Sequence, residues 1–175
     1  MSAATSRSPH ATLLEIAVSD AAAREILLAG GRAVAHVDDL QASLQGLIDA
    51  IAAPLGIASA AIVIADRSGA GLEIVATFGL DDAAAAGLDE AIRRPTHPIN
   101  RTFAEPVPTF DVQPMNPGGP ALRSHLPLFV TRGGTDSVLG VLALAHDHPI
   151  EPETQPILEA AADLAAATIE RHRPA

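Results

Sequence analysis

The sequence contains neither cysteine nor lysine. The lack of cysteine excludes disulfides, thiolate metal sites and thiol catalysis throughout the 175 residues. All 11 basic residues are arginine and 21 residues are acidic, so the net charge is −10 and the isoelectric point is near 4.9. This acidity argues against nucleic acid and against anionic membranes as partners.

Long apolar runs are missing as well. The longest, residues 52–65, is short and carries Pro54 and Gly56, so it does not predict a membrane span. The first residues lack the basic start and unbroken apolar core of a secretory signal peptide. Because 48% of the residues are nevertheless apolar, we expect one cytoplasmic globular domain with a sizeable core.

Catalytic motifs are also absent. The sequence has no P-loop, no GxGxxG, no HExxH and no GxSxG nucleophile elbow. His146 and His148 would share one face of a strand, as a metal-binding pair does, but Pro149 stops strand pairing there and no third ligand is nearby. We therefore predict no catalytic residue, no metal site and no enzymatic activity.

The most informative stretch that is present covers residues 122–146. Two apolar runs, LPLFV and VLGVLAL, are joined at 131–136 by the glycine-bearing turn TRGGTD. Both runs are short and rich in branched residues, which favours a β-hairpin over paired helices. The second run is apolar at both alternating sets of positions, so we expect both faces of that strand to be covered.

Helical patterns occupy both ends of the chain. We predict a loose tail over residues 1–10 and a helix over 11–28 that ends at Gly30 and Gly31. Asp38 or Asp39 can cap a second helix, and Thr154 a last one. The apolar faces of these two helices should pack together through Leu44, Leu47, Ile48, Ile51, Leu158, Leu164 and Ile169.

Between these helices the amino-acid composition changes twice along the sequence. Two runs, at 60–66 and 72–78, read as paired strands, and the alanine-rich residues 81–93 read as a short helix. Residues 95–120 are rich in proline and leave room only for a short helix near 100–104 and a strand at 107–112. A long proline-stiffened connection inside a compact domain is more often functional than idle.

The order of these elements predicts an α+β fold with a central antiparallel sheet of five or six strands. It also resembles the GAF domain family of small-molecule sensors. The resemblance rests on the Pro127-Leu128 pair, on LGVL at 139–142, and on the segments LGIASAAIVIAD and LEIVATFGL. It implies that the terminal helices pack on one face of the sheet and that residues 81–122 roof a ligand pocket on the other. We divide the chain into the tail, an amino-terminal helix at 11–34 and a GAF-like domain at 35–173.

The resemblance also supplies candidate ligand contacts, in the roof and the strand that faces it. They are Arg123, His125, Arg101, Phe110, His97, Asn100, Phe103, Asp111 and Met115. Some have plainer explanations, since Phe103 and Phe110 suit a core and Asn100 suits a helix cap. Arg123 either lies at the rim of the sheet or binds a carboxylate or phosphate of a ligand.

No cofactor can be named from the sequence. Free methionine sulfoxide reductases of this family need cysteines, and bilin-binding members usually attach their pigment through cysteine, which this chain lacks. The Asn-Lys-x-Phe-Asp-Glu signature of cyclic-nucleotide-binding members is missing too. Haem-binding members place a histidine in the loop before the penultimate strand, where this chain has QPMNPGGPA, although His97 or His125 could substitute.

Two functions remain open. The first is a sensory domain that binds a small molecule, with an anionic or carbonyl-bearing ligand meeting Arg123 or Arg101, and that signals through its terminal helices. The second is a structural dimerisation module with a vestigial pocket. In both cases we expect a homodimer, because the apolar stripe of residues 11–28 must be covered by something.

Overall fold

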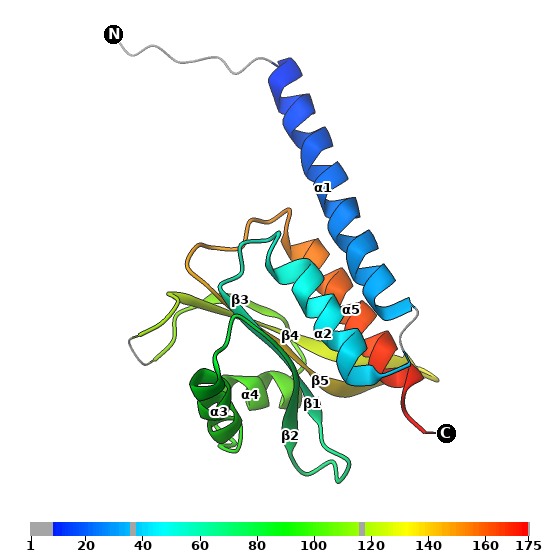
Figure 1. The fold of residues 1–175 in the computed structure, drawn as a ribbon, viewed down its shortest axis with the longest axis vertical. Coiled ribbons are helices and arrows are strands. Elements are labelled where there is room, and N and C mark those ends of the chain that lie inside the picture. The colour runs from blue at the N-terminus through cyan, green and yellow to red at the C-terminus, as the bar shows by residue number, and fades with distance from the viewer. Residues whose placement is uncertain (1–8, 36–37, 116–117, 175) are drawn as a thin grey trace.

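The structure, a computed structural model, describes residues 9–35, 38–115 and 118–174, with side chains from residue 20 onward. Over these residues the chain forms five helices and five strands (Figure 1). The helices are α1 (Pro9–Ala35), α2 (Leu40–Ala52), α3 (Asp82–Ala91), α4 (Pro98–Ala104) and α5 (Gln155–Arg171). The strands are β1 (Ser59–Ala65), β2 (Leu72–Phe78), β3 (Thr109–Val112), β4 (Leu122–Arg132) and β5 (Thr135–His146). None of the described helices is long and apolar enough to cross a membrane.

The strands form one antiparallel sheet in the order β2-β1-β5-β4-β3. β4 and β5 make the predicted hairpin, and its turn holds Gly133 and Gly134 at positive φ. β5 lies in the middle of the sheet, and residues 139–146 are all buried, which confirms that both of its faces are covered. The α+β prediction is confirmed, with five strands.

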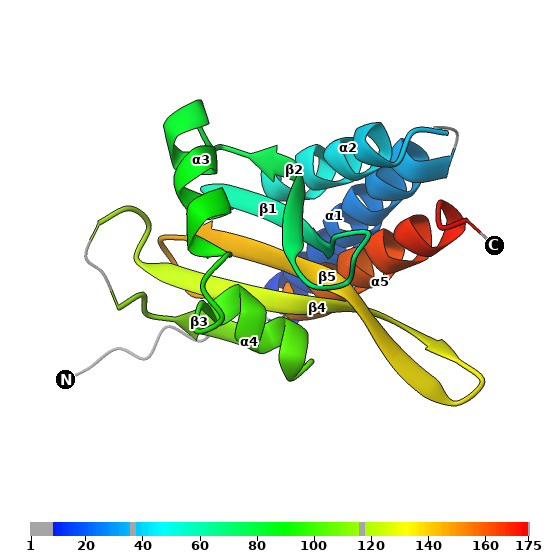
Figure 2. The ribbon, with the colours of Figure 1, turned by 90° about the horizontal axis from the view of Figure 1, so that it is seen from below.

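One face of the sheet is covered by α2 and α5, and α1 packs on these two helices from outside (Figure 2). Asp39 caps α2 by accepting a hydrogen bond from Ala42 N at 2.9 Å. Thr154 occupies the cap position of α5, but its side chain makes no capping hydrogen bond. The main core lies between sheet and helices and includes the predicted residues Leu44, Leu47, Ile48, Ile51, Ile62, Ile64, Leu126, Leu128, Leu142, Leu158 and Ile169.

The opposite face of the sheet carries α3 and α4, as the resemblance implied for the roof (Figure 2). A second, smaller core joins this roof to the sheet. It buries Ile92 and Ile99 of the roof segment against Val63 of β1 and Val141 of β5. Because strand side chains alternate between faces, Val141 and Ala143 of β5 face the roof while Leu142 and Leu144 face the main core.

The predicted end of the first helix at Gly30 and Gly31 is wrong, because α1 continues to Ala35. Packing overrides the local preference of glycine here. A Cβ at position 30 would lie 2.9 Å from Leu47 Cδ1, so the glycine lets α1 approach α2 closely. The helix also begins at Pro9, within the segment predicted as a loose tail, of which residues 1–8 lie outside the described part of the chain.

The proline-rich segment is less regular than predicted. α4 begins at Pro98, two residues early, and β3 starts only at Thr109, after Pro106 and Pro108, which have no N–H to donate to a strand. The pairing of β3 with β4 is interrupted between Thr109 and Val112, and within that interruption Asp111 has a φ of 58°.

The last turn of α5 connects three parts of the fold. Arg171 Nη2 donates to Val34 O at the end of α1, at 2.6 Å, and His172 contacts Asp38 O just before α2. Glu170 forms an ion pair with Arg132 of the β4–β5 hairpin. The amino-terminal helices are therefore held to the same turn as the central hairpin.

β5 and β1 approach closely at Gly140 of β5, which lies opposite Ile64 of β1. A Cβ at position 140 would lie 2.1 Å from Val63 O, far inside van der Waals contact. The close approach of β1 thus explains why the LGVL motif has glycine at position 140.

We predict that Gly140→Ala lowers the free energy of unfolding by about 3 kcal/mol, because the added methyl group would push β1 and β5 apart. Gly87→Ala is the matched control, since a Cβ at this position in α3 meets nothing within 4 Å. The control should raise stability by about 0.5–1 kcal/mol, the helix preference of alanine over glycine. Urea unfolding measures both, and equal stability of the two variants would contradict the assignment.

Candidate functional site

The roof face of the sheet has a floor of small residues. Ala61 of β1 and Ala143 of β5 are paired neighbours in the sheet, and both belong to the smaller core under the roof. On β4, Arg123 pairs with Ala145 and His125 pairs with Ala143, which places both polar side chains on this same face. Arg123 and His125 thus lie beside small residues of the neighbouring strand.

His125 is the unusual member of this face. Its side chain is only 5% exposed, yet it makes no hydrogen bond to any residue that the structure describes. Burial, together with the neighbouring His97 and Arg123, lowers the pKa of His125 from 6.5 to about 4. The imidazole is therefore neutral at pH 7, and its ring nitrogens make no hydrogen bond to a described residue.

His97 approaches His125 from the roof. It occupies the cap position of α4, where its Nδ1 accepts a hydrogen bond from Ile99 N at 3.3 Å. A neutral imidazole that accepts at Nδ1 carries its proton on Nε2, so Nε2–H remains as a donor. Burial and the nearby Arg94 lower the pKa of His97.

Arg123 completes the group, which we call the His97–His125–Arg123 cluster. Its Nη1 donates to Pro120 O at 2.6 Å and to Leu122 O at 3.1 Å, which fixes the guanidinium beneath the β3–β4 loop. Burial lowers the pKa of Arg123, and Asp147 counteracts this by favouring the charged form. Arg123 is half-buried, so its positive charge acts in a partly dry environment.

The other six predicted residues do not join this cluster. Arg101 and Met115 are exposed, and Phe103 packs against the smaller core. Phe110 packs against the main core on the opposite face of the sheet. Asn100 does not cap α4, since that place belongs to His97, and instead donates to Ile92 O and Arg94 O.

Sequence reasoning missed a second polar group, which lies on the helix face of the sheet. Ser124 and His146 are both buried there, with Ser124 Oγ 2.8 Å from His146 Nε2. His146 Nδ1 must donate to His148 O, because a carbonyl can only accept, so Nε2 accepts from the serine hydroxyl. Ser124 Oγ in turn accepts from Asp111 N, and Asp111 Oδ1 accepts from Ile150 N.

Every member of this second chain has its partner, so it is a structural link that fastens β3 and the segment after β5. His148 itself is exposed while His146 is buried, so the two do not form a metal-ligand pair. The described residues contain no group of three or more histidine and acidic side chains able to hold a metal ion. The alternation of side chains along the RSHL strand predicts that Ser124 and His125 lie on opposite faces of the sheet. It does not predict which residues they contact there.

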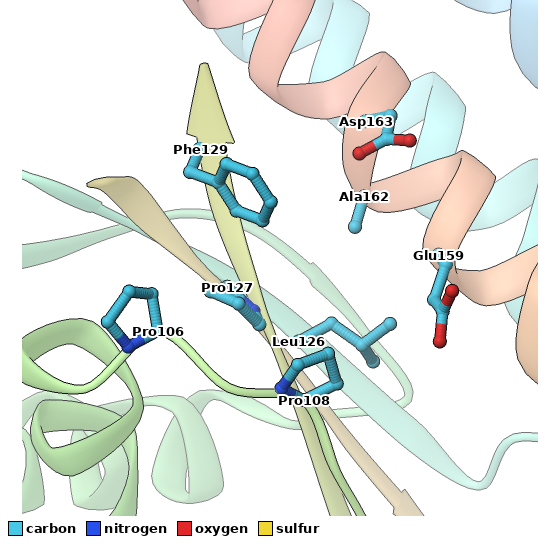
Figure 3. A pocket seen from close by; sticks show the side chains of 8 residues that line it. All are labelled: Pro106, Pro108, Leu126, Pro127, Phe129, Glu159, Ala162 and Asp163. Atoms are coloured by element: carbon cyan, nitrogen blue, oxygen red, sulfur yellow. The ribbon is translucent and has the colours of Figure 1, made fainter. Parts of the chain in front are cut away.

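Two hollows lie on the surface of the domain. A cleft of about 630 Å³ opens between the β1–β2 turn and the roof. It is lined by Asp66, Leu72, Ile92, Arg93, Asn100 and Phe103, among others, and thus includes two of the predicted residues. A smaller groove of about 290 Å³ runs between β4 and α5 on the opposite side (Figure 3).

The family model for the GAF domain matches residues 39–171. The chain belongs to the GAF domain family. The match covers the sheet, α2 to α5 and both hollows, but not α1. A search of curated protein sequences found no significant match.

Solved GAF structures share the fold at low identity. The GAF domain of a phosphoenolpyruvate-protein phosphotransferase from Coxiella burnetii aligns with a TM-score of 0.71 at 17% identity, over 85% of this chain and 93% of that one. Free methionine-R-sulfoxide reductase from Neisseria meningitidis, in complex with its substrate, gives 0.66 at 17% over 98% and 97%. A methyl-accepting chemotaxis protein gives 0.62 at 20% over 82% and 95%.

The pKa of His125 predicts a pH-dependent stability. In the unfolded chain the ring titrates near 6.5, but in the folded chain only near 4, so the unfolded state binds more protons between these values. The stability that His125 contributes is complete above pH 6.5 and is lost as the pH falls toward 4. Between pH 7 and pH 5 this loss should be about 2 kcal/mol.

Urea unfolding of the His125→Gln variant at the two pH values checks this prediction. The variant should lose about 2 kcal/mol less than the wild type over this pH range. His148→Gln removes an exposed histidine and should leave the wild-type dependence intact. A His125→Gln variant with unchanged pH dependence would contradict the buried, neutral state of the ring.

Proposed function

We propose that this GAF domain is a sensory or regulatory module that binds a small anionic molecule between the sheet and the roof. The proposal is carried by the surroundings of His125. Its side chain is buried, lies near Arg123 and His97, and has no hydrogen-bond partner among the described residues. On the helix face of the sheet, by contrast, Ser124 and His146 form their hydrogen bonds within the protein.

The charge of the cluster favours an anion. Arg123 supplies a fixed positive charge, and His97 supplies the donor Nε2–H. A carboxylate or phosphate bound among these groups would also favour protonation of His125, turning the neutral ring into a charge-assisted donor. The short helix α4 contributes both His97 of the cluster and Phe103 of the 630 Å³ cleft, so a ligand lying along α4 could use both.

Strand β4 provides a direct route from this site to the terminal helices. His125 faces the roof, while the adjacent Leu126 is buried in the main core that α5 completes. The last turn of α5 holds the end of α1 through Arg171 and Val34 O. A ligand that shifts β4 therefore acts on both terminal helices through packed contacts.

A structural dimerisation module remains the second candidate. Its support is the packing of Ile92 and Ile99, which are buried against Val63 and Val141 and close much of the space under the roof. In this case the cluster would bind no ligand, and the domain would act only through α1 and α5.

We do not assign an enzymatic activity. The similarity to the Neisseria reductase extends over nearly the whole chain, but at 17% identity it concerns the fold. Thiol chemistry is excluded here because the chain has no cysteine. We retain a cytoplasmic location as part of the proposal, on the grounds of composition given above.

Arg123→Ala tests the sensor function. Native mass spectrometry of freshly purified protein identifies any retained molecule, and a panel of small carboxylates and phosphates, scored by thermal shift, supplies a probe otherwise. The affinity for the best probe should fall by about 1.5–3 kcal/mol, the usual contribution of a charge-assisted hydrogen bond. Arg101→Ala, which removes an exposed arginine of the roof, is the control and should bind normally.

Equal loss of affinity in both variants would indicate a diffuse charge effect instead of a site. No retained molecule and no stabilising anion would leave the dimerisation module as the function.

We further propose that the chain is a homodimer formed through its terminal helices. The first half of α1 extends beyond the sheet and the other helices (Figure 1), while its second half is packed on α2, with Val34 buried. Light scattering at high micromolar concentration should give twice the mass of one chain. A monomer under these conditions would refute the homodimer.

A further inference from the structure

The outer face of α1 carries a cationic stripe with an apolar centre. Arg24, Leu28 and Arg32 follow one another at four-residue intervals, which places them along one side of the helix, and the exposed Asp20 precedes Arg24 at the same interval. All three are exposed, and Leu28 is 54% exposed, although it is a large aliphatic residue. Neither arginine forms an ion pair with a described residue. We call these three residues the α1 stripe.

The α1 stripe lies opposite the side of the helix that packs in its own chain. Ile26, Gly30 and Val34 form that inner side, since Val34 belongs to the main core, Ile26 packs against it and Gly30 lies close to Leu47 of α2. The α1 stripe therefore cannot be covered by its own domain without unpacking α1.

A surface of the opposite character lies between β4 and α5, in the 290 Å³ groove (Figure 3). Its floor and one wall are apolar and comprise Pro106, Pro108, Leu126, Pro127 and Phe129. The other wall is α5, with Ala162 between two exposed carboxylates, Glu159 and Asp163. We call this the α5 groove.

The α5 groove exists because β3 is too short to cover the edge of β4. β3 pairs with β4 only at Arg123 and His125, so the edge from Leu126 onward has no neighbouring strand. Phe129 is 38% exposed there. Like the arginines of the α1 stripe, Glu159 and Asp163 have no ion-pair partner in the described part of the chain.

We propose that the α1 stripe of one subunit docks in the α5 groove of a second copy. In this contact Leu28 of the partner subunit enters the apolar floor beside Phe129, and Arg24 and Arg32 of the partner subunit pair with Glu159 and Asp163. The two arginines are roughly 12 Å apart along the helix axis and the two carboxylates roughly 6 Å, a difference that two long arginine side chains can span from either side. A twofold axis makes the contact twice.

Charge complementarity is the reason for choosing a second copy as the occupant. Arg24 and Arg32 flank Leu28 and form no ion pair with a described residue. Their two positive charges match the acidic wall of the α5 groove. The contact also covers Leu28 and Phe129, two of the exposed large apolar side chains. The proposal rests on the homodimer proposed above and specifies its interface.

Charge reversal on each side tests the contact. The first variant combines Arg24→Glu with Arg32→Glu, and the second combines Glu159→Arg with Asp163→Arg. Each should weaken dimerisation at least about tenfold in sedimentation equilibrium, because attraction becomes repulsion at both copies of the contact. Circular dichroism and thermal unfolding establish that each variant is folded.

Mixing the two variants gives the decisive measurement. In a heterodimer the glutamates of the first variant meet the arginines of the second, and the unchanged arginines of the second meet the unchanged carboxylates of the first. The mixture should therefore dimerise with close to wild-type affinity, although neither variant does so alone.

Matched controls make the same changes of charge elsewhere on the exposed surface, with Arg67→Glu and Arg94→Glu in one variant and Glu73→Arg and Asp82→Arg in the other. Both should dimerise like the wild type. A dimer that survives both charge reversals, or variants that fail to rescue each other on mixing, would overturn the docking contact while leaving the homodimer standing. A monomeric wild type would overturn the homodimer itself, and with it this contact.

Discussion

The close approach of β5 to β1 at Gly140 is the contact on which the rest of the structure depends. β5 is the middle strand, and it is buried on both faces because helices cover each side of the sheet. Its residues Leu142 and Leu144 pack in the main core with α2 and α5, and Val141 and Ala143 pack with the roof. A wider separation at Gly140 would tilt both layers at once, since each layer is positioned by the same strand.

The alternation of side chains along β4 gives the two faces of the sheet different chemistry. Ser124 points toward the helices and belongs to a hydrogen-bonded chain that is complete within the protein. His125, one residue later, points toward the roof and lacks such a partner among the described residues. This difference separates a group whose hydrogen bonds are all made within the fold from a ring whose nitrogens bond no described residue.

Much of the fold could be predicted from the sequence, because it depends on local signals. The hairpin of β4 and β5, the cap at Asp39 and the apolar face of α2 follow from turn residues, capping chemistry and periodicity. The end of α1 could not be predicted, because Gly30 is held in the helix by its contact with Leu47, which is distant in the sequence.

The site was harder to predict for the same reason. Arg123 and His125 could be assigned to one face of a strand from their spacing, and His97 could be assigned only to the roof segment. That the charge of His97 acts on His125 depends on how α4 lies across the sheet, which no local pattern encodes. Asn100 and Asp111 have polar side chains that suit a ligand site, but their hydrogen bonds go to the backbone of the protein itself.

The irregular edge strand β3 has a consequence for assembly. An open sheet edge offers unpaired N–H and C=O groups on which another chain can add a strand, and this is a common route to aggregation. β3 is four residues long, follows Pro106 and Pro108, and is bent at Asp111 by a positive φ, so it presents no continuous row of such groups. Strand addition is thus obstructed along β3, and the free edge of β4 beyond it is interrupted by Pro127 and by the register shift between Leu128 and Phe129.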